Sequence, residues 1–226
     1  MRLGEFRLEL VDGGTERVAG EAIFGVIPEA LWDRRFPPDA AGRVLLSRRG
    51  LLVRSAGFTA LVAGFPGRYD LGRTPAHDVD ALVLSRSGGP DPDAAMASAH
   101  PRAGVYLPDS LGEAEREIRP GMTLFPLPGG AAAGGLGVRL DSDGRTAAYL
   151  ADALPTAAHV PTAWLVAGDA YPVDLVQGKK RLVDRAVRER WLCVFWRDPD
   201  VAWGTIVESA RGVRRVHGVA RDREEY

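Results

Sequence analysis

Alternating apolar and polar positions open the chain and predict β-structure. Phe6, Leu8 and Leu10 alternate with charged residues, which is the period of a half-buried strand, and residues 12–14 (Asp-Gly-Gly) are expected to turn the chain. Apolar runs of strand length follow at 51–53, 60–62, 81–84, 105–107, 122–127, 136–140, 146–150, 191–195, 205–207 and 213–216. Turn residues lie between runs 51–53 and 60–62, between 136–140 and 146–150, and between 205–207 and 213–216. Each of these pairs is therefore predicted to form a hairpin.

Two segments have helical character. The clearer one runs from about Asp174, a candidate N-cap, to Arg190, with an apolar stripe that includes Leu175 and Leu182. The other covers 110–118. Hairpin strands followed by a late helix predict an α/β (α+β) sandwich of mixed sheets. Since no repeat or linker divides the chain, residues 1–226 are expected to form one domain with a frayed tail at 221–226.

Composition narrows the classes of partner and compartment. The net charge is −1, so no overall field would attract nucleic acid or a membrane surface, and we expect neither as a partner. The single cysteine, Cys193, lies in an apolar run and fits a reducing cytoplasm. No apolar stretch approaches the roughly 20 residues that span a bilayer. The lack of asparagine fits either a heat-adapted source or an arginine-rich coding bias.

Several segments resemble a known superfamily. Residues 23–32 (Ile-Phe-Gly-Val-Ile-Pro-Glu-Ala-Leu-Trp), followed by Phe36-Pro37-Pro38-Asp39, resemble the amino-terminal segment of lactonase-like hydrolases of the metallo-β-lactamase superfamily. Residues 61–67 stand where that superfamily has a Leu-Val-Asp-Thr-Gly turn, with Ala63 in place of the aspartate, and residues 78–85 look like the strand that leads to its metal motif. The resemblance covers residues 2–216 and implies a four-layer αββα sandwich with two mixed sheets and outer helices.

The first metal motif of the superfamily is changed at every ligand. That motif, His-x-His-x-Asp-His, brings imidazoles and a carboxylate to one or two metal ions. The corresponding positions here hold Arg86, Gly88, Pro90 and Asp91, of which only Asp91 could still bind a metal.

The later metal motifs of the superfamily have similar flanking residues in this chain but lack most of the ligand histidines. Gly130 stands where a Thr-Pro-Gly-His turn has its ligand, and Arg197 stands where a final His-Asp-Pro motif has its histidine. The bridging aspartate survives as Asp152, and residues 155–159 are similar to Pro-Thr-x-x-His, ending at His159. The two-metal site of the superfamily uses five histidines, whereas this chain has 4 in all. The resemblance therefore implies a lost metal site, and we expect no zinc or other metal cofactor.

Arginine charge is predicted to replace the metal. Arg86 and Arg197 stand at ligand positions on opposite sides of Asp152, so the resemblance implies that both point at it. A buried carboxylate without a counter-charge costs several kcal/mol, and guanidinium groups are suited to carboxylates. We predict an Arg86–Asp152–Arg197 cluster; the alternative is that one or both arginines reach solvent. Asp91, Asp93, Asp152 and His159 are the group that could otherwise hold a residual metal.

Other suggestive residues have structural interpretations. His159 is either a remnant that lines the old cleft or, as we favour, a core histidine that holds the loop 155–161. The basic run 179–181 is interpreted as the solvated face of the long helix. Ser85 and Ser87 have no histidine near them in the sequence, which disfavours a serine nucleophile.

Three functions fit these observations. The favoured one is a non-catalytic protein (a pseudoenzyme) that binds a small molecule or a protein partner, a second copy of the chain included. The second is a metal-independent enzyme that works through Asp91, Asp152, His159 and the two arginines. The third is a residual metal-dependent hydrolase of the lactonase or esterase type. The sequence identifies neither a ligand nor a partner.

Overall fold

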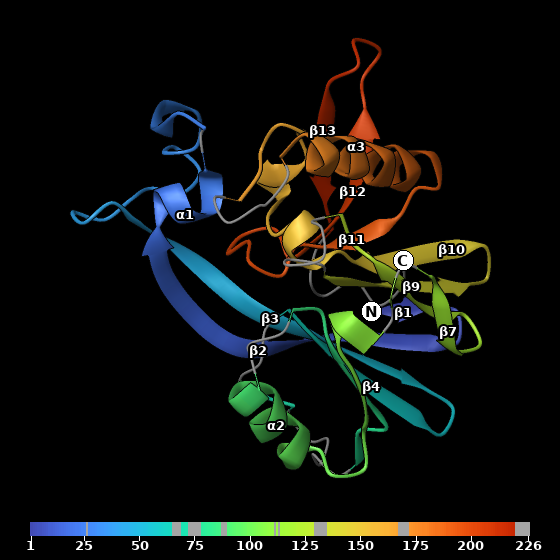
Figure 1. Ribbon diagram of the computed structural model, residues 1–226. Helices are drawn as coiled ribbons and strands as arrows, with labels where there is room; N and C mark the ends of the chain where they lie inside the picture. The colour runs from blue at the N-terminus through green and yellow to red at the C-terminus, as the bar shows by residue number, and fades with distance from the viewer. Residues whose placement is uncertain are drawn as a thin grey trace.

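A computed structural model describes residues 1–25, 27–64, 69–71, 78–86, 90–110, 112, 114–128, 135–166 and 172–219. In these ranges two mixed β-sheets pack against each other, and helices lie on the outer sides (Figure 1). This arrangement confirms the predicted αββα sandwich.

The first sheet has the strand order β1-β2-β3-β4-β5-β6. Its strands are β1 (Arg2–Leu3), β2 (Phe6–Ala19), β3 (Arg43–Ser55), β4 (Phe58–Ala63), β5 (Ala81–Leu84) and β6 (Gly104–Tyr106). The β3–β4 hairpin is the predicted one, and Gly57 in its turn has a φ of 65°. β5 pairs in parallel with both neighbours and is buried at every position, as expected of a strand covered on both faces.

The second sheet has the order β13-β12-β11-β10-β9-β8-β7. Its strands are β7 (Arg116–Arg119), β8 (Met122–Pro126), β9 (Leu136–Ser142), β10 (Arg145–Tyr149), β11 (Leu192–Val194), β12 (Trp203–Glu208) and β13 (Arg214–Gly218). β10 and β11 are parallel, and the other pairings are antiparallel. The β9–β10 and β12–β13 hairpins are confirmed.

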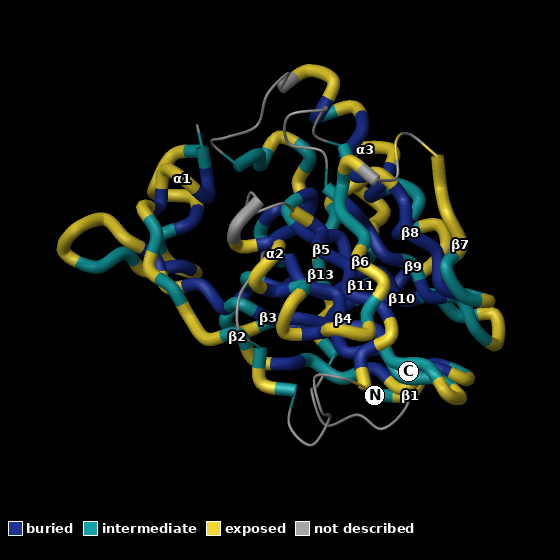
Figure 2. The backbone as a smooth tube through the Cα atoms, turned by 60° about the horizontal axis from the view of Figure 1, so that its bottom comes forward, coloured by how far each residue is buried: buried dark blue, intermediate teal, exposed yellow. Residues whose placement is uncertain are grey.

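The main core lies between the sheets, and each outer helix packs on one of them. Met96 of α2 (Pro90–Ala99) packs against the outward side chains of the first sheet, including Leu82 and Leu84. Leu182 and Val183 of α3 (Pro172–Arg188) join the core of the second sheet. Burial is therefore concentrated in the strands at the centre of the molecule (Figure 2).

β2 and β3 extend beyond the sandwich as a curved arm (Figure 1). Residues 12–14 do not turn the chain as predicted, because they form a bulge within β2 between Asp12 and Thr15. Gly14 has a φ of 88°, and a Cβ on Gly13 would lie 2.7 Å from the Tyr69 ring, so the glycines serve this bulge. α1 (Gly20–Phe24) and the 3-10 turn η1 (Glu29–Leu31) follow at the end of the arm.

Two helix predictions need correction. The described residues of 110–118 do not form the predicted helix: Ser110 ends the 3-10 turn η3 (Pro108–Ser110), and residues 116–118 belong to the edge strand β7. α3 begins at Pro172, so Asp174 lies in its first turn, where a negative charge favours the helix dipole, and is not the N-cap. α2 was not predicted, because its small and acidic residues form no apolar stripe. Among the described helices, none is both long and apolar enough to cross a bilayer.

Candidate functional site

Side chains from both sheets meet at one edge of the sandwich. Ser85 and Arg86 follow β5, Asp152 lies in the 3-10 turn η4 (Ala151–Ala153) after β10, and Arg197 follows β11. A hydrogen bond from the Leu136 amide to the Ser85 carbonyl, 2.9 Å long, joins the end of β5 to the second sheet. The carboxyl ends of parallel strands are a common place for ligand sites, so this edge is the candidate site.

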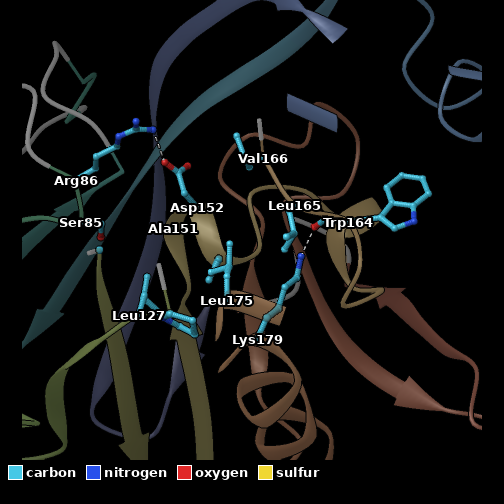
Figure 3. Close-up of a pocket in the computed structure, with 13 residues that line it drawn as sticks. Ser85, Arg86, Leu127, Ala151, Asp152, Trp164, Leu165, Val166, Leu175 and Lys179 are labelled. Atoms are coloured by element: carbon cyan, nitrogen blue, oxygen red, sulfur yellow. Dashed lines mark hydrogen bonds and ion pairs between the residues drawn. The ribbon is translucent and has the colours of Figure 1, made fainter. Parts of the chain in front are cut away.

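Arg86 and Asp152 form an ion pair at this edge. Nη1 of Arg86 donates to Oδ2 of Asp152 at 2.8 Å (Figure 3). The side chains are 54% and 27% exposed, so the pair contributes at most about 1 kcal/mol to stability and serves mainly to orient the two groups. Ala151, just before Asp152, has a φ of 41°, a left-handed conformation that costs an alanine about 1 kcal/mol.

Arg197 takes a different partner from the predicted one. Its Nη2 donates to Oε1 of Glu16 at 2.5 Å, and its guanidinium lies over the Trp196 ring, 5.2 Å from the centroid. The reason is the backbone: the Ser47 amide donates to the Arg197 carbonyl at 3.1 Å, which holds Arg197 beside the arm where β2 presents Glu16. The three-residue cluster is therefore corrected to two separate ion pairs.

Both ion pairs line one cleft of about 240 Å³. We call it the arginine cleft; it is lined by Glu16, Arg48, Arg86, Asp152, Trp196 and Arg197. Glu16 and Arg48 were not singled out in the sequence, because both come from the arm and nothing in their local pattern indicates what they face.

Asp198 organises the loop that carries Arg197. Its carboxylate is fully buried and accepts hydrogen bonds from the backbone amides of Ala157, Asp200 and Val201, at 2.9 to 3.0 Å. Arg35, which follows η1, adds an ion pair of 2.9 Å. Asp198 thus holds the loop after β11 in place.

His159 is a core histidine. Its Nε2 lies 2.8 Å from the Ile23 carbonyl, which can only accept, so Nε2 carries the proton and Nδ1 accepts from the Thr156 hydroxyl at 2.7 Å. The ring stacks on Phe24, with centroids 5.4 Å apart. Burial, helped by the charge of Lys179, lowers the pKa of His159 to about 3. With both nitrogens occupied, His159 is not available to bind a metal.

Lys179 corrects the interpretation of the basic run. It is 2% exposed, and its Nζ donates to the carbonyl of Trp164 (Figure 3). Lys180 is exposed and pairs with Asp184 at 2.9 Å. The helical period accounts for the difference, since position 179 lies four residues after the buried Leu175, on the same face.

A second, smaller cleft adjoins the ion pair of Arg86 and Asp152. We call it the inner cleft; its lining includes Ser85, Arg86, Leu127, Asp152, Leu175 and Lys179 (Figure 3). Its volume is about 30 Å³, enough for one or two water molecules.

The described residues do not fit a metal centre. A catalytic zinc site needs about three protein ligands. Among the residues that the structure describes, His, Cys, Asp and Glu form no group of three or more that could hold a metal ion. Gly130 and the side chain of Asp91 lie outside the described residues. The described carboxylates that line the arginine cleft are those of Asp152 and Glu16, and each is paired with an arginine.

Unpaired polar atoms concentrate at the two clefts. In the described part of the chain, the buried side-chain nitrogens and oxygens without a hydrogen-bond partner are Ser85 Oγ, Asp152 Oδ1, Trp196 Nε1 and Arg197 Nε. All of these residues line the arginine cleft or the inner cleft. A buried polar group that stays unpaired costs about 1–3 kcal/mol, and in the described residues such groups are concentrated at this edge.

Comparison by sequence finds no relatives, whereas comparison by structure does. No family model matches the chain, and the search of curated proteins finds no match. A probable metal-dependent hydrolase from Staphylococcus aureus has a TM-score of 0.77 at 15% identity, covering 99% of both chains. AidC, a dizinc quorum-quenching lactonase, has a TM-score of 0.73 at 12% identity, covering 97% of this chain and 96% of its own.

A third structure carries the superfamily name. The hydrolase AbOPH of the β-lactamase superfamily has a TM-score of 0.71 at 12% identity, with the same coverage as AidC. Identities this low establish the fold and leave the chemistry to be argued from the site. The chain thus has the fold of metal-dependent hydrolases of the metallo-β-lactamase type, as its sequence resemblance predicted.

Proposed function

We propose that this chain is a non-catalytic protein on a metallo-β-lactamase scaffold, and that it acts by binding a ligand or a protein partner at the former metal edge. The observation that carries this proposal is the ion pair of Arg86 and Asp152. An arginine at a position where the resemblance implies a metal ligand lies 2.8 Å from the aspartate that would bridge the metals.

The charges around Asp152 support the loss of the metal. A dication on Asp152 Oδ2 would lie within about 5 Å of the Arg86 guanidinium, where an effective dielectric constant of about 20 gives a repulsion of roughly 7 kcal/mol. Arg86 would have to leave the carboxylate first. Even then, the described side chains of the arginine cleft would supply only the carboxylates of Asp152 and Glu16, and Glu16 is paired with Arg197. A catalytic zinc site needs about three protein ligands and an open position.

Open polar space supports a binding role. The arginine cleft retains about 240 Å³ at the edge where the resemblance places the metal ligands, and charged side chains make up most of its lining. A protein that used the fold only as a scaffold would be expected to fill this space with apolar side chains. As part of the same proposal, we place the protein in the cytoplasm, where its one buried cysteine stays reduced.

Metal-dependent hydrolysis is the second candidate. It is favoured by the structural neighbours, which include a dizinc lactonase, and by the unpaired Oδ1 of Asp152. The two candidates differ in metal content and in turnover, so one preparation can separate them.

The test is metal analysis combined with an activity assay. The protein is produced in medium supplemented with zinc, manganese and iron, and its metal content is measured by mass spectrometry alongside hydrolysis of lactone and ester substrates. We expect less than about 0.1 metal ion per chain and no hydrolysis above the uncatalysed rate. About one metal ion per chain, together with hydrolysis that a chelator abolishes, contradicts the proposal and supports the second candidate.

A further inference from the structure

We propose that the arginine cleft binds a tetrahedral oxyanion that carries a hydroxyl group, with hydrogen phosphate as the simplest example. This inference rests on the proposed function, since it requires that the cleft hold no metal. The charge of the cleft is the first argument. Three arginines and two carboxylates line it, so its described side chains have a net charge of +1.

Two unpaired donors are the second argument. Nε1 of Trp196 and Nε of Arg197 are buried without a partner, and both groups can only donate. They belong to stacked groups, because the Arg197 guanidinium lies over the Trp196 ring at 5.2 Å. A ligand with several acceptor oxygens is the kind that could accept from two such neighbouring donors.

The orientation of these donors is fixed from several sides. A Cβ on Gly64 would lie 2.7 Å from the Trp196 indole, so the indole packs directly on the backbone of Gly64. Glu16 holds the other end of the Arg197 guanidinium at 2.5 Å. Such preorganised donors bind an anion without losing further side-chain freedom.

An unpaired acceptor narrows the class of anion. Oδ1 of Asp152 is buried without a partner, while Oδ2 accepts from Arg86. A carboxylate repels a fully ionised oxyanion but accepts a hydrogen bond from an anion that keeps a hydroxyl group. Hydrogen phosphate keeps a hydroxyl group near pH 7 and sulfate does not, so the cleft is expected to distinguish between them.

The side chain of Arg86 can move to admit the anion to the cleft. Its side chain is 54% exposed and forms one ion pair of modest strength, so it can turn from Asp152 toward the incoming anion at little cost. The oxyanion would then be held by Arg86, Arg197 and Trp196, with its hydroxyl group on Asp152. The cleft volume of about 240 Å³ corresponds to roughly eight water molecules, which is ample for this anion.

The experiment is isothermal titration calorimetry of the full chain with sodium phosphate and with sodium sulfate at pH 7. For the natural chain we expect phosphate to bind at least about tenfold more tightly than sulfate. Asp152→Asn should remove this preference, because an amide can donate to sulfate. Trp196→Phe, which keeps an aromatic ring at this position but loses the N–H donor, should weaken phosphate binding about fivefold to twentyfold.

Two further variants control for general charge effects and for folding. Lys180→Ala removes an exposed cation outside the cleft and should change neither affinity. If Asp152→Asn does not fold, Arg86→Gln on a half-exposed side chain replaces it and should weaken phosphate binding about tenfold.

Three outcomes overturn the inference. These are equal affinities for the two anions in the natural chain, a phosphate dissociation constant above about 10 mM, and a preference that survives Asp152→Asn. If any one of these outcomes is found with a metal-free protein, the inference fails while the proposed function stands. If the protein carries stoichiometric metal and a chelator abolishes phosphate binding, the proposed function fails as well.

Discussion

Replacing His159 with glutamine should change how stability depends on pH. His159 is fully buried, and burial lowers its pKa to about 3 from an ordinary value of 6.5. Above pH 6.5 the ring is neutral in both the folded and the unfolded chain. Below pH 6.5 the unfolded chain takes up a proton that the folded chain excludes, so the folded state loses stability until the pH falls to about 3.

The size of this loss follows from the pKa difference. Each pH unit between the two values costs about 1.4 kcal/mol, so His159 alone should lower the free energy of unfolding by about 2.7 kcal/mol between pH 6.5 and pH 4.5. Glutamine does not titrate. At pH 7, His159→Gln should cost about 2–4 kcal/mol through lost packing on Phe24 and weaker hydrogen bonds to Ile23 and Thr156. That cost should shrink by about 2.7 kcal/mol at pH 4.5.

Urea unfolding, followed by tryptophan fluorescence at pH 7.0 and pH 4.5, measures both quantities. His217→Gln is the matched control, because His217 is exposed on β13 and its loss should leave the pH dependence of the natural chain unchanged. If the difference between the natural chain and His159→Gln is the same at both pH values, His159 is not held neutral in the core and our reasoning about it is wrong.

Two further predictions concern buried polar groups. Lys179→Ala should lower the melting temperature by roughly 5–10 °C, because it removes a buried stem and the donor to the Trp164 carbonyl, whereas Lys180→Ala should lower it by less than about 2 °C; equal shifts contradict the assignment of Lys179 to the buried face. Burial raises the pKa of the Cys193 thiol to about 12, so an aromatic disulfide reagent at pH 8 should leave the folded protein unmodified and react fully after denaturation. Rapid reaction of the folded protein would show that Cys193 is accessible.

Local patterns predicted the strands well and the short helices poorly. The run 81–84 is apolar at every position, and only a strand covered on both faces buries such a run, as β5 does. In contrast, residues 110–118 have some helical character but little that is apolar, and the last of them pair with β8 as part of β7. The glycines at 13 and 14 indicated an unusual backbone conformation, but both a bulge and a turn favour glycine, so the sequence could not distinguish between them.

Contacts at the site could be predicted only between residues that belong to the sequence motifs of the resemblance. The contact of Arg86 with Asp152 could be expected because the sequence resemblance places both positions at ligands of one metal site. Glu16 could not be found in this way, since it reaches Arg197 from the arm, 181 positions away in the chain. Lys179 could have been found: its spacing from Leu175 places it on the buried face, but its charged neighbours suggested a solvated one.

A crystal structure of the protein soaked in zinc, with anomalous data collected at the zinc edge, is the most direct test of the exchange of metal for arginine. We predict no anomalous peak within coordination distance of Asp152. The Arg86 guanidinium should stay about 3 Å from the Asp152 carboxylate or turn to a bound anion. A zinc ion coordinated by Asp152, with Arg86 displaced into solvent, would contradict the proposed replacement of the metal by arginine. It would favour metal-dependent hydrolysis instead.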